Sequence, residues 1–263
     1  MVFMKQSLID LIFLSRKRKQ LLLFLNKNPG TRDEIRDLLQ ISPASVRPQL
    51  KIMKDSGLIV EEKNSYELSK VGKVLVGKMQ DFLGAAELFE DNFEYWAKRD
   101  LSVIPPFLRD RIEELGHCEL FEPGPAHMFE TPLHLAENLL ESKEVLTFVS
   151  YFHPEAPFLY EDLVKRGVEL KLCMTEEVAG HLFREYPEEA GVMQQANNSK
   201  LSICRRPVKL PSIVVTDRFM VLKLYEKDGK PRDQLLISSE ERALSWGREL
   251  FMYYRELSEP IFK

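Results

Sequence analysis

The 263-residue sequence predicts a two-domain α/β protein, and three observations support this fold class. Residues 31–70 follow the order helix, tight turn, helix and two short strands around a polar tip. From about residue 131 onward, apolar runs of strand length alternate with amphipathic helical stretches, which favours an α/β domain with a largely parallel central sheet. The first 70 residues are also basic, whereas the remainder is acidic.

The helix-turn-helix part of this order depends on helix-start signals. Thr31 is suited to cap a helix, and Glu34 three residues later completes a capping box. Ser42 is a suitable N-cap for a second helix, and Pro43 fits its first position, where no backbone N–H is needed. The sequence therefore predicts two helices separated by a short turn.

The second helix and the segment after it complete the pattern. Gly57 is expected to end this helix. Pro48 lies inside it and predicts a kink or a delayed start, because proline lacks a backbone donor. Residues 58–68 then alternate apolar and polar side chains around Lys63, Asn64 and Ser65, which is typical of a hairpin with turn residues at its tip. Together these elements predict a winged helix-turn-helix domain over residues 1–70.

Several positions of this segment also carry a family resemblance. A pattern that marks a recognition helix running into a wing is matched by Ser45, Leu50, Met53, Gly57, Leu58 and Ile59. The segment resembles the winged-helix domain of archaeal and bacterial regulators of the arsenic-repressor and sugar-sensing TrmB type. This resemblance implies binding to double-stranded DNA. The alternative is a protein-binding or dimerisation module, because a fold does not fix a function.

The predicted recognition helix and wing supply candidate DNA contacts. Four side chains of the helix are expected to face the major groove: Ser45, Arg47, Gln49 and Lys51. Two side chains of the wing are expected to approach the backbone or the minor groove: Lys63 and Asn64. Two further cations are expected to neutralise phosphates: Arg32 and Lys54.

The charge of the chain is unevenly distributed. The net charge is −4, but residues 1–70 hold 13 Lys and Arg against 8 Asp and Glu, a net charge of +5. Residues 71–263 therefore carry a net charge of −9. A basic segment attached to an acidic one fits a DNA-binding domain joined to a domain with another role. The alternative is that the basic excess is only a solvated surface.

A long apolar-rich helix is predicted after the wing. Residues 71–96 expose more apolar side chains than a lone helix can bury, so we expect residues 71–110 to form a linker and dimerisation helix with a hinge near Pro105 and Pro106. DNA half-sites are commonly read by two-fold symmetric dimers, which favours a homodimer. The alternative is that this helix packs only on its own second domain.

Residues 111–263 are predicted to form the α/β domain. Buried strands are expected at 145–152, 168–174 and 200–206, with a hairpin over 212–226. Helices are expected at 133–140, 156–167 and 176–186, and a closing helix begins at Ser238 or Ser239 and ends before Pro260.

The second half also resembles a known family. The resemblance depends on the order of elements, on the turn at Asp217 and Arg218, and on the closing helix around Trp246 and Gly247. These features are similar to the regulatory domain of archaeal winged-helix regulators of methanogenesis, including methyltransferase-specific regulators of methanogens, and the resemblance covers nearly the whole chain. That domain is distantly similar to the phospholipase D-like effector domain of TrmB sugar sensors. The implied role is to sense a small molecule or a partner.

Catalytic motifs are missing from the sequence. Phospholipase D chemistry needs a histidine with a lysine two residues later, and none of the five histidines has one. There is no Gly-rich phosphate loop and no G-x-S-x-G. Cys118, Cys173 and Cys204 are widely separated and lack zinc-site spacing. We therefore expect a protein that is not an enzyme and that has no cofactor and no metal.

An effector site is expected beyond the carboxyl ends of the strands, where ligands usually bind in open α/β sheets. Five side chains near these ends would suit an anionic metabolite: Tyr151, His153, Thr175, Arg205 and Arg206. The alternative for the two arginines is pairing with surface carboxylates such as Glu176 and Glu177.

These features together predict a cytoplasmic, dimeric, one-component transcription regulator with no membrane partner. No apolar run approaches the roughly 20 residues that span a bilayer, and the odd number of cysteines favours a reducing compartment. The competing hypothesis is a protein-interaction scaffold that uses the winged helix as a module without DNA.

Overall fold

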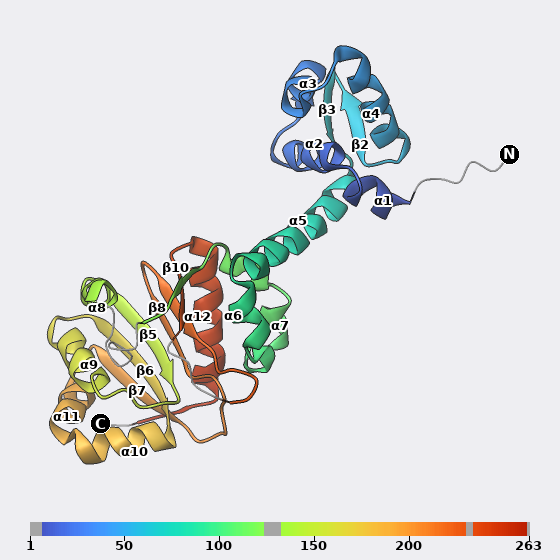
Figure 1. The fold of residues 1–263 in the computed structure, drawn as a ribbon. Helices are drawn as coiled ribbons and strands as arrows, with labels where there is room; N and C mark the ends of the chain where they lie inside the picture. The colour runs from blue at the N-terminus through green and yellow to red at the C-terminus, as the bar shows by residue number, and fades with distance from the viewer. Residues whose placement is uncertain (1–6, 124–132, 230–233, 262–263) are drawn as a thin grey trace. The chain divides into compact units, whose positions relative to one another are not determined.

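The computed structural model describes residues 7–123, 133–229 and 234–261. It divides into two compact units, Met1–Leu83 (unit 1) and Gly84–Lys263 (unit 2). The division falls inside helix α5 (Lys70–Asp91), so this helix contributes residues to both units. Figure 1 shows the helices and strands of both units.

Unit 1 combines helices with a small sheet. Its elements before α5 are α1 (Leu8–Phe13), α2 (Arg16–Lys27), β1 (Gly30–Thr31), α3 (Arg32–Leu39), α4 (Pro43–Asp55), β2 (Ile59–Glu62) and β3 (Ser65–Leu68). The three strands lie in the order β1-β3-β2, and both pairings are antiparallel. Buried side chains of α2, α3 and α4 pack with those of the hairpin in one core.

The predicted helix signals act at the expected places. The Thr31 hydroxyl accepts a hydrogen bond from the Glu34 N–H, and the Glu34 carboxylate accepts one from the Thr31 N–H at 2.7 Å, which completes the capping box. Helix α4 begins at Pro43 and continues through Pro48, so the delayed start is not observed. Ser42 is the N-cap, but its hydroxyl contacts the Ser45 hydroxyl instead of capping a backbone N–H.

Two left-handed backbone segments shape the end of α4 and the hairpin. Gly57 has φ +75° and follows α4, and the Leu58 N–H donates to the carbonyl of Met53 at 3.0 Å, as in a Schellman motif. Lys63 and Asn64 have φ values of 46° and 67° between β2 and β3. Two consecutive positive φ values are those of a type I′ turn, whose twist suits a two-residue hairpin.

The sheet of unit 2 has eight described strands in the order β11-β7-β6-β5-β8-β9-β10-β4. Their bounds are β4 (Glu119–Phe121), β5 (Glu144–Val149), β6 (Glu169–Thr175), β7 (Ser199–Cys204), β8 (Ser212–Thr216), β9 (Met220–Lys223), β10 (Leu235–Ser238) and β11 (Glu259–Pro260). Only the β5–β6 and β6–β7 pairs of these strands are parallel.

The prediction of a largely parallel sheet is therefore wrong, because the sheet is mixed. Helices cross over between β5, β6 and β7, as parallel neighbours require. After β7 the chain reaches β8 without a crossover helix, and β8 pairs antiparallel with β5 on the other side. The hairpin to β9 and the pairings of β10 and β4 are also antiparallel.

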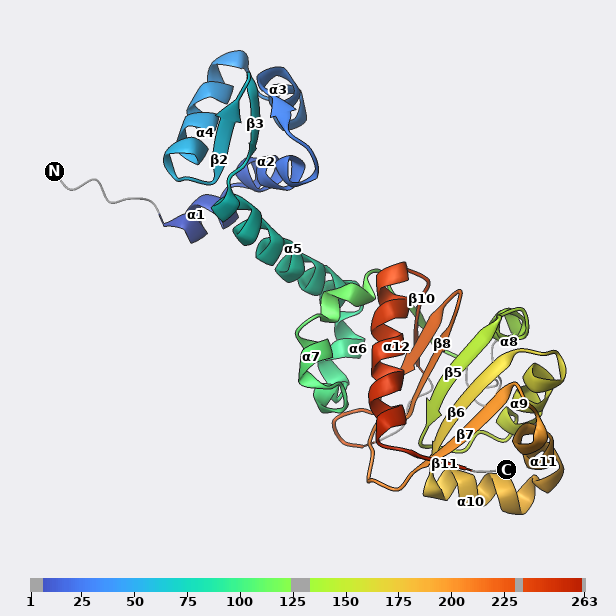
Figure 2. The same cartoon turned by 180° about the vertical axis from the view of Figure 1, so that it is seen from behind.

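Helices cover both faces of this sheet (Figure 2). Unit 2 contains α6 (Phe93–Lys98), α7 (Pro106–Arg109), α8 (Leu133–Leu140), α9 (Ala156–Lys165), α10 (Glu176–Glu185), α11 (Pro187–Gln195), α12 (Glu241–Glu256) and the 3-10 helices Leu101–Val103 and Ile112–Leu115. Leu146 and Phe148 of β5 pack on the side of α12, whereas Val145 packs on the side of α9. Alternate strand residues thus serve two separate cores.

The single long helix predicted over residues 71–96 is wrong. Helix α5 ends at Asp91, and α6 begins at Phe93 after a break at Asn92. The Asn92 side-chain amide donates to the carbonyl of Cys118 at 3.2 Å, so this asparagine is tied to the chain leading into β4. A tertiary contact at the break therefore accompanies the end of the helix.

The three cysteines are buried and form no disulfide. Burial raises the pKa of the Cys118 thiol to about 12 and that of the Cys173 thiol to about 11. Both side chains therefore stay as neutral thiols near neutral pH. Among the described helices, none is both long and apolar enough to cross a bilayer.

Candidate nucleic-acid interface and ligand cavity

The exposed face of α4 carries three of the four predicted groove contacts. Ser45, Arg47 and Lys51 are exposed, whereas Val46 and Leu50 between them are buried against the core of unit 1. Within the described residues, Arg47 and Lys51 make no side-chain hydrogen bond and no ion pair. Their charges are therefore available to a partner outside the chain.

Gln49, the fourth residue, is half-buried and points to α2. Its side-chain oxygen accepts a hydrogen bond from Nε of Arg18 at 3.1 Å. This contact places the basic N-terminal turn of α2, with exposed Arg16 and Lys17, close to the middle of α4. The sequence shows the basic cluster but not this neighbourhood, because the two residues are 31 positions apart.

The two predicted phosphate-binding cations belong to one polar network. Arg32 donates to the Tyr66 hydroxyl at 3.4 Å, and this hydroxyl donates to Glu61 at 2.8 Å. Lys54 forms an ion pair with the same carboxylate at 2.6 Å. The Lys54 and Tyr66 hydrogen bonds lower the pKa of Glu61, and the Glu61 hydrogen bond raises the pKa of Lys54. One carboxylate thus offsets part of the charge that these two cations would offer to phosphate.

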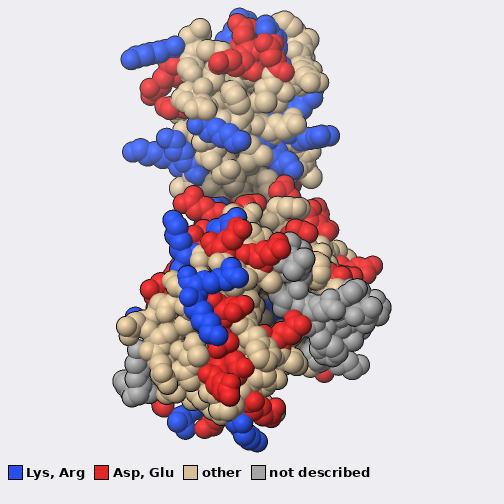
Figure 3. Space-filling model, turned by 90° about the vertical axis from the view of Figure 1, so that its left-hand side faces the viewer, with Lys and Arg blue, Asp and Glu red and all other residues tan. Residues whose placement is uncertain are grey.

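Lys63 and Asn64 form the tip of the β2–β3 hairpin, and both side chains are exposed. On the face drawn in Figure 3, acidic and basic side chains are interspersed in both units. That face shows no continuous basic surface over the described residues.

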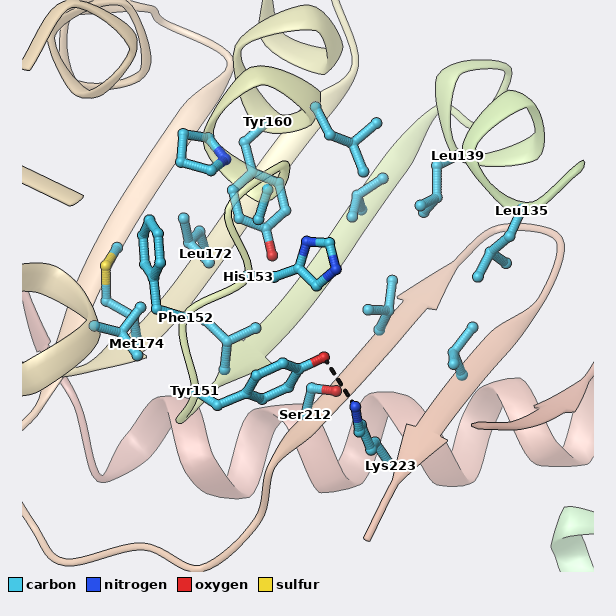
Figure 4. Close-up of a pocket in the computed structure, with 18 of the residues that line it drawn as sticks. Leu135, Leu139, Tyr151, Phe152, His153, Tyr160, Leu172, Met174, Ser212 and Lys223 are labelled. Carbon is cyan, nitrogen blue, oxygen red and sulfur yellow. Dashed lines mark hydrogen bonds between the residues drawn. The ribbon is translucent and has the colours of Figure 1, made fainter. Parts of the chain in front are cut away.

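Unit 2 contains a cavity of about 150 Å³ on the face of the sheet opposite α12. Strands β5, β6, β8, β9 and β10 supply its floor, and helices α8, α9 and α10 supply its walls. Most of its lining is apolar, including Leu135 and Leu139 of α8 and Leu172 and Met174 of β6 (Figure 4).

Several polar side chains line one side of this cavity. Tyr151, Ser212 and Lys223 direct their polar atoms toward one another, with His153 and Tyr160 on the neighbouring wall (Figure 4). Lys223 is only 4% exposed, and its ammonium lies 3.5 Å from the Tyr151 hydroxyl and 4.5 Å from the centre of that ring. Burial raises the pKa of Tyr160 to about 12, so its hydroxyl remains neutral.

The structure separates the five predicted effector residues. Tyr151 and His153 line the cavity, whereas the other three are not among the described residues that do so. Thr175 caps helix α10 through its hydroxyl. Arg205 forms ion pairs with Glu176 at 3.3 Å and with Glu259 at 3.2 Å, and Arg206 is exposed. Pairing of Arg205 with a surface carboxylate is the alternative that the sequence left open.

Asp217, Arg218, Trp246 and Gly247, on which the family resemblance of the second half depends, all make contacts within unit 2. The indole N–H of buried Trp246 donates to the carbonyl of Leu108 at 2.9 Å. A Cβ atom at Gly247 would lie only 3.0 Å from a Val215 methyl group, a tight contact. Asp217 accepts a hydrogen bond from the Lys143 N–H, and Arg218 pairs with Glu141 at 2.7 Å. None of the four lines the described cavity.

The sequence-based site prediction named only Tyr151 and His153 of the cavity residues, and it missed Ser212 and Lys223 beside them. A signal for Lys223 exists, because it is the lone charge within the apolar run 219–225. The sequence around Ser212 gives no such signal, because its place in the cavity depends on the register of the β8–β9 pair. Ser212 and Lys223 are directly opposite each other in the β8–β9 pair, so their side chains share one face of the sheet.

Two family models match the chain. Residues 6–87 match the N-terminal domain, and residues 128–257 match the middle domain, of the methanogenesis regulatory protein FilR1. A curated relative, the methanogenesis regulatory protein FilR1 of Methanothrix harundinacea (strain 6Ac), is 26% identical over 256 residues. The match covers 95% of this chain and 57% of the relative, so the chain spans little more than half of that protein's length. Both models describe a regulatory protein, in agreement with the prediction that the chain is not an enzyme.

Two solved structures are distantly similar. The structure of TrmBL2, described as an archaeal chromatin protein with a novel mode of DNA binding, is 16% identical and has a TM-score of 0.42, with 92% of this chain and 93% of that chain covered. The dimethyltransferase RosA from Streptomyces davawensis is 14% identical, with a TM-score of 0.23 and coverage of 73% and 62%. Both scores are below 0.5, so neither likeness supports a statement about this chain.

Proposed function

The chain belongs to the family of methanogenesis regulatory proteins, and on this premise we propose that it is a DNA-binding transcription regulator whose unit 2 senses a small molecule or a partner. The matched regions fall in both units, so each unit has a counterpart in the family. Fold and family alone do not fix activity, so the DNA-binding role depends on the residues of unit 1 that could contact DNA.

We infer that unit 1 is a winged helix-turn-helix. Helices α3 and α4 are joined by a short turn, and the β2–β3 hairpin follows directly, as this motif requires. In such domains the second helix of the pair enters the major groove while other elements contact the backbone. Helix α4 is the corresponding helix here.

The exposed cations of α4 are the observation that carries the proposal. Arg47 and Lys51 lie four residues apart on one face of α4, without ion-pair partners in the described chain. The N-terminal turn of α2 adds Arg16 and Lys17 through the Arg18–Gln49 contact. Phosphate neutralisation by such cations supplies most non-specific affinity, and base contacts supply preference. We assign Ser45, Arg47 and Lys51 to base contacts and the α2 turn to phosphates.

The network around Glu61 refines the roles of the remaining candidates. Lys54 and Arg32 are held by Glu61 and Tyr66, so we assign them mainly to fixing α4 and α3 against the hairpin. We assign Gln49 to fixing α4 against α2, through its hydrogen bond from Arg18. Lys63 and Asn64 at the hairpin tip remain the proposed backbone or minor-groove contacts.

We further propose that the protein acts as a homodimer. Helix α5 exposes Val71, Val74 and Phe82, with exposed fractions of 56%, 67% and 61%. The ring of Phe13 at the end of α1 lies edge-on to Phe82, with centroids 6.0 Å apart, and exposed Leu14 follows it. This apolar surface of α1 and α5 supports a two-fold contact, as readers of symmetric half-sites use.

Fluorescence anisotropy with a labelled duplex from the region upstream of the chain's own gene tests the DNA proposal. Arg47→Ala should weaken binding to the native duplex by roughly tenfold or more and reduce the preference over a scrambled duplex. The control is Lys27→Ala, which removes an exposed cation at the far end of α2, about 16 Å along the helix from its start. Equal affinity and preference in wild type and Arg47→Ala would overturn the placement of α4 in the groove.

A further inference from the structure

We propose that the cavity of unit 2 binds a small amphipathic carboxylate, with the carboxylate at Lys223, Tyr151 and Ser212 and the apolar part among the leucines of α8 and β6. The regulatory meaning of this site depends on the proposed function above. The binding itself does not, because it concerns unit 2 alone.

The polar side of the cavity is built by the register of the sheet. Val149, the last residue of β5, is opposite Ser212 of β8, and Ser212 is opposite Lys223 of β9. These three residues form one row across three strands and line the cavity together. Tyr151 follows β5 by two residues, after a hydrogen bond from the Ser150 N–H to the Pro211 carbonyl fixes the chain there. The donors are therefore placed by backbone pairing.

The chemistry of this row suits a carboxylate. Lys223 is a buried cation. The hydroxyls of Tyr151 and Ser212 can each donate a hydrogen bond to a carboxylate oxygen. An anion that reaches Lys223 gains attraction that water screens only weakly at a site this enclosed. The His153 ring lies on the adjacent wall, and its Nδ1 accepts a hydrogen bond from the Glu155 N–H at 3.3 Å.

The rest of the cavity excludes a strongly polar ligand. Beyond the polar row, the described lining consists mainly of aliphatic and aromatic side chains from α8, α9, β6 and β10. The hydroxyl groups of a sugar would lose their hydrogen bonds to water here without replacing them, which is costly for each group. An aliphatic or aromatic body fits this lining, because apolar pockets with a few placed polar groups are typical of small-molecule sites.

The volume limits the size of the ligand. A cavity of about 150 Å³ is comparable to an engineered apolar cavity that admits benzene. A ring or a short chain with a carboxylate, roughly six to ten non-hydrogen atoms, is therefore the matching size class. Benzoate and hexanoate represent its aromatic and aliphatic members.

The test is calorimetric titration of the full chain with benzoate and hexanoate, each beside its neutral amide, benzamide or hexanamide. We expect at least one acid to bind at 1:1 stoichiometry and to bind roughly tenfold or more tightly than its amide, because a charged hydrogen-bond pair is lost in the amide. Absence of binding by both acids, or equal binding of acid and amide, would overturn the proposal.

Variants locate the binding. Lys223→Met keeps a side chain of similar length without charge and should weaken acid binding by roughly tenfold or more while leaving amide binding unchanged. Lys200→Met makes the same substitution at an exposed position of β7 and should change neither. Equal loss in both variants would contradict a site at Lys223.

A second pair of variants keeps the test decisive if Lys223→Met fails to fold, as judged by circular dichroism. Ala156→Phe places a ring in the cavity from the start of α9 and should abolish binding of acids and amides alike. Tyr151→Phe removes only the hydroxyl and should weaken the acid more than the amide. Unchanged binding in both folded variants would overturn the proposal.

Ligand binding and DNA binding are measured separately. A chain that binds the acid but no DNA supports the cavity site and argues against the regulator. A chain that binds DNA but neither acid supports the regulator and overturns the cavity site.

Discussion

The two units handle positive charge in opposite ways. In unit 1, Arg47 and Lys51 lie on the exposed face of α4, and the exposed Lys54 forms an ion pair with Glu61. In unit 2, Lys223 lies inside an apolar cavity beside Tyr151. Exposed cations suit a large polyanion that meets the protein at its surface, whereas an enclosed cation suits a small anion that enters it. This difference in burial is the basis for proposing two different kinds of anion as partners of the two units.

Unit 2 should depend most strongly on its interior. Trp246→Ala removes a fully buried ring and leaves the Leu108 carbonyl without its N–H donor. The free energy of unfolding of unit 2 should fall by about 3–5 kcal/mol, as large core truncations do. Urea denaturation followed by circular dichroism measures this loss. Met252→Ala on the exposed face of the same helix is the control, expected within about 0.5 kcal/mol of wild type. A similar cost at both positions would contradict the described core.

In unit 1 we expect a surface substitution to change the oligomeric state. Phe82→Glu places a charge in the exposed apolar surface of α1 and α5, and a charge at a desolvated two-fold contact is costly. Sedimentation velocity should show a shift from dimer to monomer, while the helical content stays unchanged. Phe158→Glu, at an exposed phenylalanine of α9 in unit 2, should leave the mass unaltered. A dimer that survives Phe82→Glu would place the contact elsewhere.

The network around Glu61 offers a finer test of the same contrast. The pKa of Glu61 is lowered in the folded chain, so its contribution to stability is present above the unfolded pKa and is lost as pH falls through the folded pKa. Glu61→Gln should therefore reduce stability at neutral pH, and the difference from wild type should shrink on acidification. Thermal melts from pH 7 to pH 3 measure this difference. Glu62→Gln, at the exposed neighbouring position, is the control.

The same variant separates structure from DNA contact. Without the carboxylate, Lys54 loses its ion-pair partner, so non-specific DNA affinity should rise a few-fold at low salt. A fall in affinity would show that Glu61 holds Lys54 in a DNA-binding position.

Local signals made much of unit 1 predictable from the sequence. The capping box of Thr31 and Glu34, the helix start at Pro43 and the turn at Lys63 and Asn64 are properties of a few adjacent residues. The ion pair between Lys54 and Glu61 was not predicted, because it depends on how the β2–β3 hairpin packs against α4.

Unit 2 shows where local signals end. Strands β5, β6 and β7 were predicted as buried strands. The antiparallel pairings of β8 with β5 and of β10 with β9 and β4 are not specified by periodicity. The same limit applies to the cavity. Tyr151 was expected at a strand end, whereas Lys223, 72 positions away, joins it only through the register of three strands.

The central claim is tested most directly by the affinity of the purified full chain for its own upstream duplex at several salt concentrations, beside a scrambled duplex. The account predicts preference for the native duplex and a linear fall of log affinity with log salt, because Arg47, Lys51 and the α2 turn release counterions from phosphates. Absence of DNA binding at every salt concentration, with or without the carboxylates tested above, would contradict it and favour a module that binds a protein partner.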